Sequence, residues 1–174
     1  MANGFNSSRR PAARWWARPG LDYVANELCV AGQPVAACAR AAGTPLYLYD
    51  GSRVRDNLAR LHAALAAQGL RHRIFYAMKS NRHAPLLTWL RQLGGCGIDA
   101  CSPGEVRWAR SRSFAPDNIS FTGTSLSDAD LGELLRHPGL ILNLDSMHDI
   151  RRVGALAPGR RRHYLSMVEP WQTS

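Results

Sequence analysis

One lysine stands among the basic residues of this chain, and its side chain offers chemistry that the others lack. Of the 22 lysine and arginine residues in the 174-residue sequence, Lys79 is the only lysine. An arginine guanidinium stays protonated, whereas a lysine amine can lose its proton and attack an aldehyde to form a Schiff base. Lys79 directly follows the apolar run 74–78. At the end of a buried strand we expect the amine to be partly desolvated, which favours its neutral, nucleophilic form.

A second interpretation stays open from the residues alone, in which Lys79 is a solvated lysine at the start of a helix. Further along the chain, other polar side chains lie in or after apolar runs. Asp99 lies within one such run, Ser102 follows it, and Thr122 ends the next. In parallel α/β folds the chemistry is found beyond the carboxyl ends of the strands. If Asp99 faces this end, it could hold the charge of the lysine or orient an imine.

These polar residues require a regular scaffold, and the chain shows one. Runs rich in β-forming residues predict strands at 46–49, 74–78, 97–101, 119–122 and 140–144. The last four begin about 22 residues apart, with apolar helical patterns between them. Runs that are apolar at successive positions indicate parallel strands covered on both faces. Ser102, Pro103 and Glu105 form a helix start with a capping box, and Gly94 marks a helix stop.

Strand–helix repeats with short loops imply right-handed βαβ connections. Two architectures fit, an open doubly wound sheet and a (β/α)₈ barrel. No G-x-G-x-x-G follows a strand, so nothing supports the dinucleotide-binding version of the doubly wound sheet. We therefore predict an α/β fold of the TIM-barrel type. A complete barrel takes about 250 residues, so we expect a partial barrel, truncated at about half.

The net charge of +9 does not predict a nucleic-acid partner. Residues 1–20 carry four arginines and residues 151–163 carry five, both without an acid, whereas the body between them is close to neutral. No run approaches the ~20 apolar residues of a membrane span, and the amino terminus lacks a secretory signal, which predicts no membrane contact and a cytoplasmic location. No metal site is expected, because zinc-type pairing is absent from the four cysteines, Cys29, Cys38, Cys96 and Cys101.

Five segments resemble, in order and spacing, the fold-type III pyridoxal-phosphate decarboxylases (ornithine, diaminopimelate and arginine decarboxylase family 2). Residues 75–81, FYAMKSN, resemble the Y-A-x-K-x-N motif of fold-type III enzymes. Residues 97–105, GIDACSPGE, resemble the G-x-D-x-x-S-x-x-E segment of the decarboxylase branch. The other matching segments are 45–50, 121–123 and 144–146. The resemblance covers about residues 44–157 and is nearest to the diaminopimelate decarboxylases.

The resemblance implies pyridoxal 5'-phosphate as cofactor, with Lys79 as the catalytic residue that forms the Schiff base. It implies that Asp99 and Glu105 also bind the cofactor. The weaker cofactor-binding candidates are Tyr76, Asn81 and Ser102. The implied reaction is loss of the α-carboxylate from an amino acid such as diaminopimelate, ornithine, lysine or arginine, as in lysine or polyamine biosynthesis. The implied partners are this small-molecule substrate and a second copy of the chain, in a homodimer with shared active sites.

Three alternatives stay open: an alanine-racemase-type enzyme, a non-catalytic pyridoxal-phosphate-binding barrel, and an inactive gene remnant or basic-ended interaction module. Along the chain we expect a disordered basic extension at 1–20, a lead-in segment at 21–43, the amino-terminal half of the barrel at 44–168, and a tail unlike the family at 169–174. The family's phosphate-binding glycine-rich loop lies beyond the barrel's midpoint. We therefore expect the activity of this chain alone to be impaired or absent.

Overall fold

The computed structural model describes the backbone of residues 18–158 and 164–166, and the side chains of 18–158. The chain divides into two compact units, residues 1–56 and 57–174. Most of the predicted extension at 1–20 and all of the predicted tail at 169–174 lie outside the described residues. Within the described part of the chain, no helix is long and apolar enough to cross a membrane.

The first unit contains a small antiparallel sheet followed by a short helix. Its elements are β1 (Leu21–Val24), β2 (Glu27–Val30), β3 (Gln33–Pro34) and α1 (Val35–Ala42). The two turns of the sheet each hold two residues with positive φ, Ala25–Asn26 and Ala31–Gly32. Such pairs suit the two-residue turns that join antiparallel strands. The sequence patterns did not predict this sheet, because alanine at the first turn position conceals the usual Asn-Gly or Gly-Gly signal.

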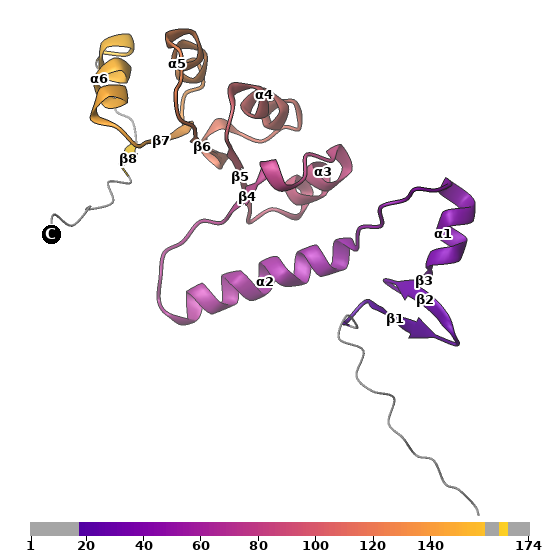
Figure 1. Cartoon of the computed structure of the whole chain (residues 1–174). Helices are drawn as coiled ribbons and strands as arrows, with labels where there is room; N and C mark the ends of the chain where they lie inside the picture. The colour runs from indigo at the N-terminus through magenta and orange to yellow at the C-terminus, as the bar shows by residue number, and fades with distance from the viewer. Residues whose placement is uncertain (1–17, 159–163, 167–174) are drawn as a thin grey trace, which may run out of the picture. The chain divides into compact units, whose positions relative to one another are not determined.

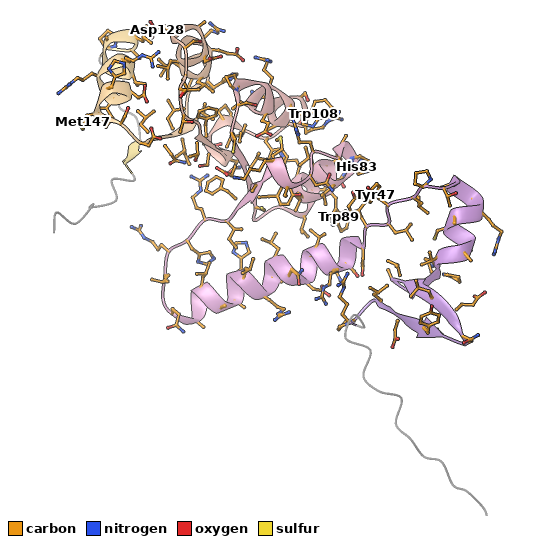
Figure 2. All side chains as sticks on the ribbon, viewed as in Figure 1. Tyr47, His83, Trp89, Trp108, Asp128 and Met147 are labelled. Atoms are coloured by element: carbon orange, nitrogen blue, oxygen red, sulfur yellow. The ribbon has the colours of Figure 1, made fainter. Side chains whose placement is uncertain are left out.

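The strand predicted at 46–49 is wrong. This run belongs to no strand of the described structure, and Tyr47 is 83% exposed (Figure 2). A strand forms only where a neighbouring strand pairs with its backbone N–H and C=O groups, and no described strand pairs with this run. Helix α2 (Gly51–Ala67) follows. Asp50 begins it by accepting hydrogen bonds from the backbone N–H groups of Ser52 and Arg53, at 2.9 and 3.2 Å.

The second unit is built on a five-stranded parallel sheet whose strands follow one another in chain order (Figure 1). The strands are β4 (Phe75–Ala77), β5 (Gly97–Ala100), β6 (Ile119–Thr122), β7 (Ile141–Leu144) and β8 (Tyr164–Ser166). The connecting helices are α3 (Ala84–Leu93), α4 (Pro103–Ser111), α5 (Asp128–Leu135) and α6 (Met147–Leu156), with short 3₁₀ helices η1 (Met78–Ser80) and η2 (Pro116–Asn118). A sheet without reversal of strand order keeps its right-handed crossover helices on one face. This arrangement confirms the predicted α/β fold of the partial-barrel type.

One face of the parallel sheet is apolar and the other is polar. The inner positions of the apolar face are almost fully buried: Ile98, Ala100, Ile119, Phe121, Leu142 and Leu144. Helices α4 and α6 pack on the same strands. The alternate positions carry polar groups, including the part-exposed Asp99 and Asn143. The expectation of strands covered on both faces is therefore wrong for the described residues, because alternate strand positions carry polar side chains and the helices cover only the other side.

The helix start predicted at Ser102 is confirmed, but the predicted capping box is wrong, because the Glu105 carboxylate accepts a hydrogen bond from the Cys101 N–H and not from the Ser102 N–H. The Ser102 hydroxyl accepts a hydrogen bond from the Glu105 N–H at 3.2 Å and begins α4. Ser127 and Ser146 begin α5 and α6 in the same way. Helix α3 ends at the predicted stop, where Gly94 has a φ of 74°, a left-handed conformation that favours glycine. These starts and stops define the loops that carry the polar residues beyond each strand.

Candidate functional site

Lys79 lies immediately beyond β4, in the short helix η1. The Ser80 hydroxyl donates a hydrogen bond to the Ala77 carbonyl at 2.7 Å, which closes this turn. Met78 is fully buried, whereas the side chain of Lys79 is exposed. The predicted desolvation of Lys79 is therefore wrong: the strand ends at Ala77, and the turn that follows buries the methionine and directs the next residue outward. Among the described residues, Lys79 has no hydrogen-bond or ion-pair partner, so its amine is free to react.

Asp99 lies on the adjacent strand β5, in register with Ala77 of β4. Partial burial raises the pKa of the Asp99 carboxyl, and the positive charge of Lys79 offsets part of this rise. The pKa of the neighbouring Cys101 thiol is also raised, by burial and by the negative charge of Asp99, and Lys79 again acts in the opposite direction. The structure thus brings the amine of Lys79 near the carboxyl of Asp99, at the carboxyl ends of two paired strands.

A hydrogen-bonded network extends from Asp99 across the polar face of the sheet. The Thr122 hydroxyl donates to Asp99 Oδ1 at 3.5 Å. Asn143 Nδ2 donates to Thr122 Oγ1 at 2.8 Å and to Ser120 Oγ at 2.9 Å. Ser120 and Asn143 were not predicted as site residues, although a lone polar residue within an apolar strand was a signal for this face. The network holds the carboxyl of Asp99 in place from β6 and β7.

Glu105 supports the turn between β5 and α4. Glu105 is 6% exposed, and its Oε2 accepts a hydrogen bond from the Cys101 N–H at 2.8 Å. Arg82 lies with its Nε 3.9 Å from Glu105 Oε1. The negative charge of Glu105 acts on both Asp99 and Cys101, raising the pKa of each. Glu105 is therefore close to the predicted site, and one of its oxygens is committed to the backbone.

Of the three weaker candidates, Tyr76 lies in β4, Asn81 directly after η1 and Ser102 directly before α4, and all three bind local backbone. The Tyr76 hydroxyl donates to the Asn81 carbonyl at 3.3 Å. Asn81 Oδ1 accepts from the His83 N–H at 2.9 Å, ahead of α3. Ser102 caps α4. These residues shape the loops on which Lys79 and Asp99 stand, and their polar atoms are engaged there.

The arrangement suits an aldehyde-bearing organic cofactor. An exposed primary amine can condense with an aldehyde, and the nearby carboxyl of Asp99 has a raised affinity for a proton. Hydroxyl and amide groups on the same face add hydrogen-bond donors and acceptors for polar substituents.

Known proteins that resemble this chain also point to an aldehyde-bearing cofactor. Residues 52–168 match the family model of the pyridoxal binding domain of pyridoxal-dependent decarboxylases. The chain is similar to diaminopimelate decarboxylase of Methanothermobacter thermautotrophicus, with 36% identity over 131 residues that cover 75% of this chain and 30% of the relative. It is also similar to the diaminopimelate decarboxylase of Mycobacterium bovis, with 30% identity over 82% of this chain and 31% of the relative. The chain thus spans about a third of the length of the curated relatives it matches.

The fold of the chain is also similar to that of solved structures. AQ1208 from Aquifex aeolicus superposes with a TM-score of 0.74 at 26% identity, covering 84% of this chain and 36% of that protein. Diaminopimelate decarboxylase from Helicobacter pylori, complexed with L-lysine, gives a TM-score of 0.60 at 28% identity, covering 70% of this chain and 30% of that protein.

Proposed function

Because the chain belongs to the pyridoxal-dependent decarboxylases, we propose that Lys79 binds pyridoxal phosphate as a Schiff base and that Asp99 and Glu105 contribute to the cofactor site. The cofactor class follows from the family, and the residue roles are the proposal. The observation that carries it is that Lys79 follows β4 and Asp99 lies on the paired strand β5, at the carboxyl ends of both strands, where the charge of Lys79 acts on the Asp99 carboxyl. This end of a parallel barrel is where the chemistry of such folds is found.

The residues of the described site fit the cofactor. Lys79 would hold the cofactor through its Nζ, because the attack of a primary amine on an aldehyde carbon can form a C=N bond with loss of the aldehyde oxygen as water. The attack needs the unprotonated amine, and a neighbouring carboxyl with a raised pKa can hold the displaced proton. Thr122 and Asn143 orient that carboxyl through the hydrogen-bonded network. Glu105 keeps the β5–α4 turn in shape through its bond to the Cys101 N–H.

The reaction that we propose is decarboxylation of an amino acid of the diaminopimelate class, the substrate named for the relatives. When bound, pyridoxal phosphate supplies an electron-accepting ring that stabilises the charge left at the α-carbon. The contribution of Lys79 is to hold the cofactor and then to exchange a proton at the α-carbon through its Nζ. We also propose a homodimer with shared active sites, as the family implies, and sedimentation velocity at increasing protein concentration tests this.

Reductive labelling tests the role of Lys79 directly. The chain is incubated with pyridoxal phosphate, reduced with borohydride and digested, and the modified residue is located by mass spectrometry. Lys79 and the amino terminus are the only primary amines that can carry the label, because the chain has one lysine. We expect the label on Lys79. Absence of that label from a sample with a cooperative melting transition would refute the proposal.

The matched control is Lys79→Arg, which keeps the positive charge and cannot condense with an aldehyde. We expect this variant to lose the specific label while keeping the melting temperature of the natural chain. Substrate class is tested separately, by carbon dioxide release from diaminopimelate, ornithine, lysine and arginine. Release from diaminopimelate above the other three supports the proposed substrate. Specific labelling without release from any of them would leave cofactor binding standing and refute decarboxylation by this chain.

A further inference from the structure

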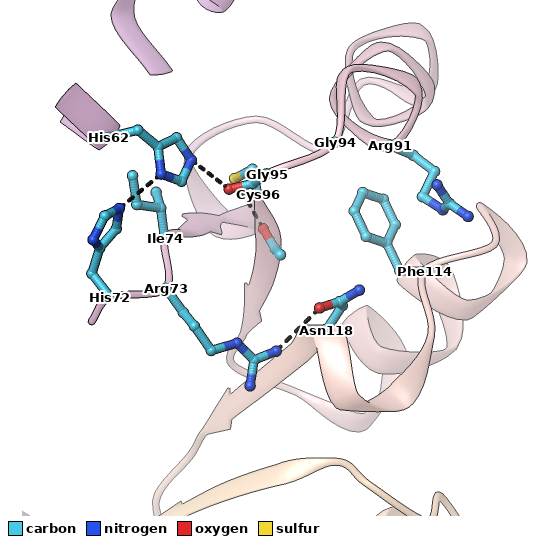
Figure 3. A pocket seen from close by; sticks show the side chains of 11 residues that line it. His62, His72, Arg73, Ile74, Arg91, Gly94, Gly95, Cys96, Phe114 and Asn118 are labelled. Atoms are coloured by element: carbon cyan, nitrogen blue, oxygen red, sulfur yellow. Dashed lines mark hydrogen bonds between the residues drawn. The ribbon is translucent and has the colours of Figure 1, made fainter. Parts of the chain in front are cut away.

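A pocket of about 280 Å³ lies at the other end of the same strands, where β4 and β5 begin (Figure 3). Its polar side chains come from four elements: His62 in α2, His72 and Arg73 in the segment before β4, Arg91 in α3, and Asn118 in η2. The lining of this pocket contains no aspartate or glutamate. The proposed cofactor site uses none of these residues, so the pocket has no role in the function proposed above.

Two histidines in this pocket form a chain of three hydrogen bonds. His62 Nε2 lies 2.8 Å from the Gly95 carbonyl oxygen, and His72 Nδ1 lies 3.0 Å from the Leu70 carbonyl oxygen. The inner nitrogens, His62 Nδ1 and His72 Nε2, lie 2.9 Å apart (Figure 3). A carbonyl can only accept, so both outer nitrogens carry a hydrogen. In two neutral rings the inner nitrogens would then face each other with lone pairs.

One additional proton resolves this conflict. Placed between His62 and His72, it converts the facing lone pairs into an N–H···N hydrogen bond and gives the pair a charge of +1. Histidine is the side chain whose charge most often changes near neutral pH, so a test of this proton compares weakly acid with weakly alkaline solution. The other titratable or charged groups that line the pocket are Arg73, Arg91 and Cys96. Burial raises the pKa of the Cys96 thiol, which keeps it uncharged, so the lining carries only positive charge.

Arg73 and Asn118 face the pocket as hydrogen-bond donors. Arg73 Nη2 donates to the Asp117 carbonyl and, at 3.1 Å, to Asn118 Oδ1. This second bond occupies the amide oxygen of Asn118 and leaves its NH₂ group as the remaining donor. In the described part of the chain, Arg73 Nε and Nη1 and the amide NH₂ of Asn118 form no other hydrogen bond, and the Arg73 guanidinium lies over the Phe75 ring, 5.0 Å from its centroid. Arg91 is anchored at the rim by a 2.9 Å hydrogen bond from its Nε to the Ser113 carbonyl.

We propose that this pocket binds a small inorganic oxyanion, of the sulfate or phosphate type, and that the shared proton of His62 and His72 strengthens its binding. Two arginines and a protonated histidine pair supply positive charge, and Arg73 and Asn118 supply free N–H groups. An anion satisfies these donors and lowers the repulsion among the cations. Binding and protonation are then linked, because each one favours the other.

Sulfate is the appropriate probe, because its charge stays constant from weakly acid to weakly alkaline pH. Binding to the full chain is measured by isothermal titration calorimetry at about pH 6 and about pH 8, on either side of the histidine titration. We expect sulfate to bind about tenfold more weakly at the higher pH, because one nearby positive charge is lost. Absence of saturable binding at the lower pH would refute the proposal, and so would equal affinity at the two pH values.

The sharpest variant is Asn118→Asp, which keeps an oxygen for Arg73 and replaces the free NH₂ group with a negatively charged oxygen. We expect it to abolish sulfate binding. Arg73→Gln should weaken binding more than Arg71→Gln, which removes the same net charge from an exposed position outside the lining. His72→Gln should remove the pH dependence, whereas the exposed His148 of α6 serves as the control, His148→Gln, and should leave it intact.

Each variant is compared with the natural chain by its melting transition, so that loss of folding is separated from loss of binding. Unchanged affinity in Asn118→Asp would overturn the proposal. Equal weakening by Arg73→Gln and Arg71→Gln would also overturn it, by showing binding to overall charge only. Lys79→Gln, which removes the positive charge at the proposed cofactor site, must leave sulfate binding unchanged, since loss of binding there would place the anion in that site. This control also separates failure of this proposal from failure of the proposed function.

Discussion

Replacing Glu105 by alanine should destabilise the second unit by about 3 kcal/mol. The carboxylate of Glu105 is buried and accepts the Cys101 N–H at 2.8 Å. A hydrogen bond to a charged group contributes about 1.5–3 kcal/mol, and its loss leaves the N–H without its partner. The charge also lies in the first turn of α4, where the helix dipole adds about 0.3–1 kcal/mol. Arg82 adds little, because its side chain is 67% exposed and lies 3.9 Å away.

Glu105→Gln is the matched variant for this reasoning. Its amide oxygen can accept the same N–H from Cys101, so only the charge is lost, and we expect a cost of about 1 kcal/mol. Arg82→Gln should change stability by less than about 0.5 kcal/mol. The measurement is urea unfolding at neutral pH, followed by circular dichroism, with equal m-values across the variants. A loss of unfolding free energy below about 0.5 kcal/mol for Glu105→Ala would refute the role of this hydrogen bond. Equal losses for Glu105→Ala and Glu105→Gln would show that only the charge of Glu105 matters.

Two further predictions use the same assay. The pKa of Asp99 is raised above its ordinary value of 3.8, because burial favours the protonated carboxyl in the folded protein. The stability that this protonated form contributes is full below pH 3.8 and is lost as pH rises through the pKa of the folded protein. Asp99→Asn should therefore become more stable relative to the natural chain as pH rises from about 4 to 7, and a constant difference would contradict this. Gly97→Ala should cost about 2 kcal/mol, because the added Cβ would lie 2.5 Å from the Asn118 carbonyl oxygen and 2.6 Å from the Phe75 ring. Gly132→Ala, in α5 with nothing within 4 Å of the added Cβ, should instead stabilise by up to about 1 kcal/mol, and similar effects at the two glycines would refute the argument.

The parts of the site that the sequence predicts are those set by local chemistry. Ser102 and Glu105 predict the start of α4, because capping depends on residues three apart in the chain. The ends of the apolar runs then place Lys79 and Asp99 at one edge, because parallel strands share their carboxyl ends. Neither inference requires knowledge of distant contacts.

The failures arise where a distant partner decides the structure. The run 46–49 has the composition of a strand, but strand formation depends on a neighbour, which composition does not reveal. The exposure of Lys79 depends on the turn that follows Ala77, and the apolar run before it gave no sign of that turn. The hydrogen bond between His62 and His72 joins residues ten positions apart, across the end of a helix and the segment that follows.

The two ends of the sheet can be tested independently because of their separation. Lys79 follows β4 and Arg73 precedes it. A strand rises about 3.3 Å per residue and a 3₁₀ helix about 2.0 Å, so four steps to Ala77 and two into η1 separate them by up to roughly 17 Å. This exceeds the Debye length of about 8 Å at physiological salt, so a charge change at one end has little electrostatic effect at the other. Lys79→Gln and Asn118→Asp each change the charge at one end only. Labelling of Lys79 in the Asn118→Asp variant therefore reports on the cofactor site alone, and sulfate binding in the Lys79→Gln variant reports on the histidine pocket alone.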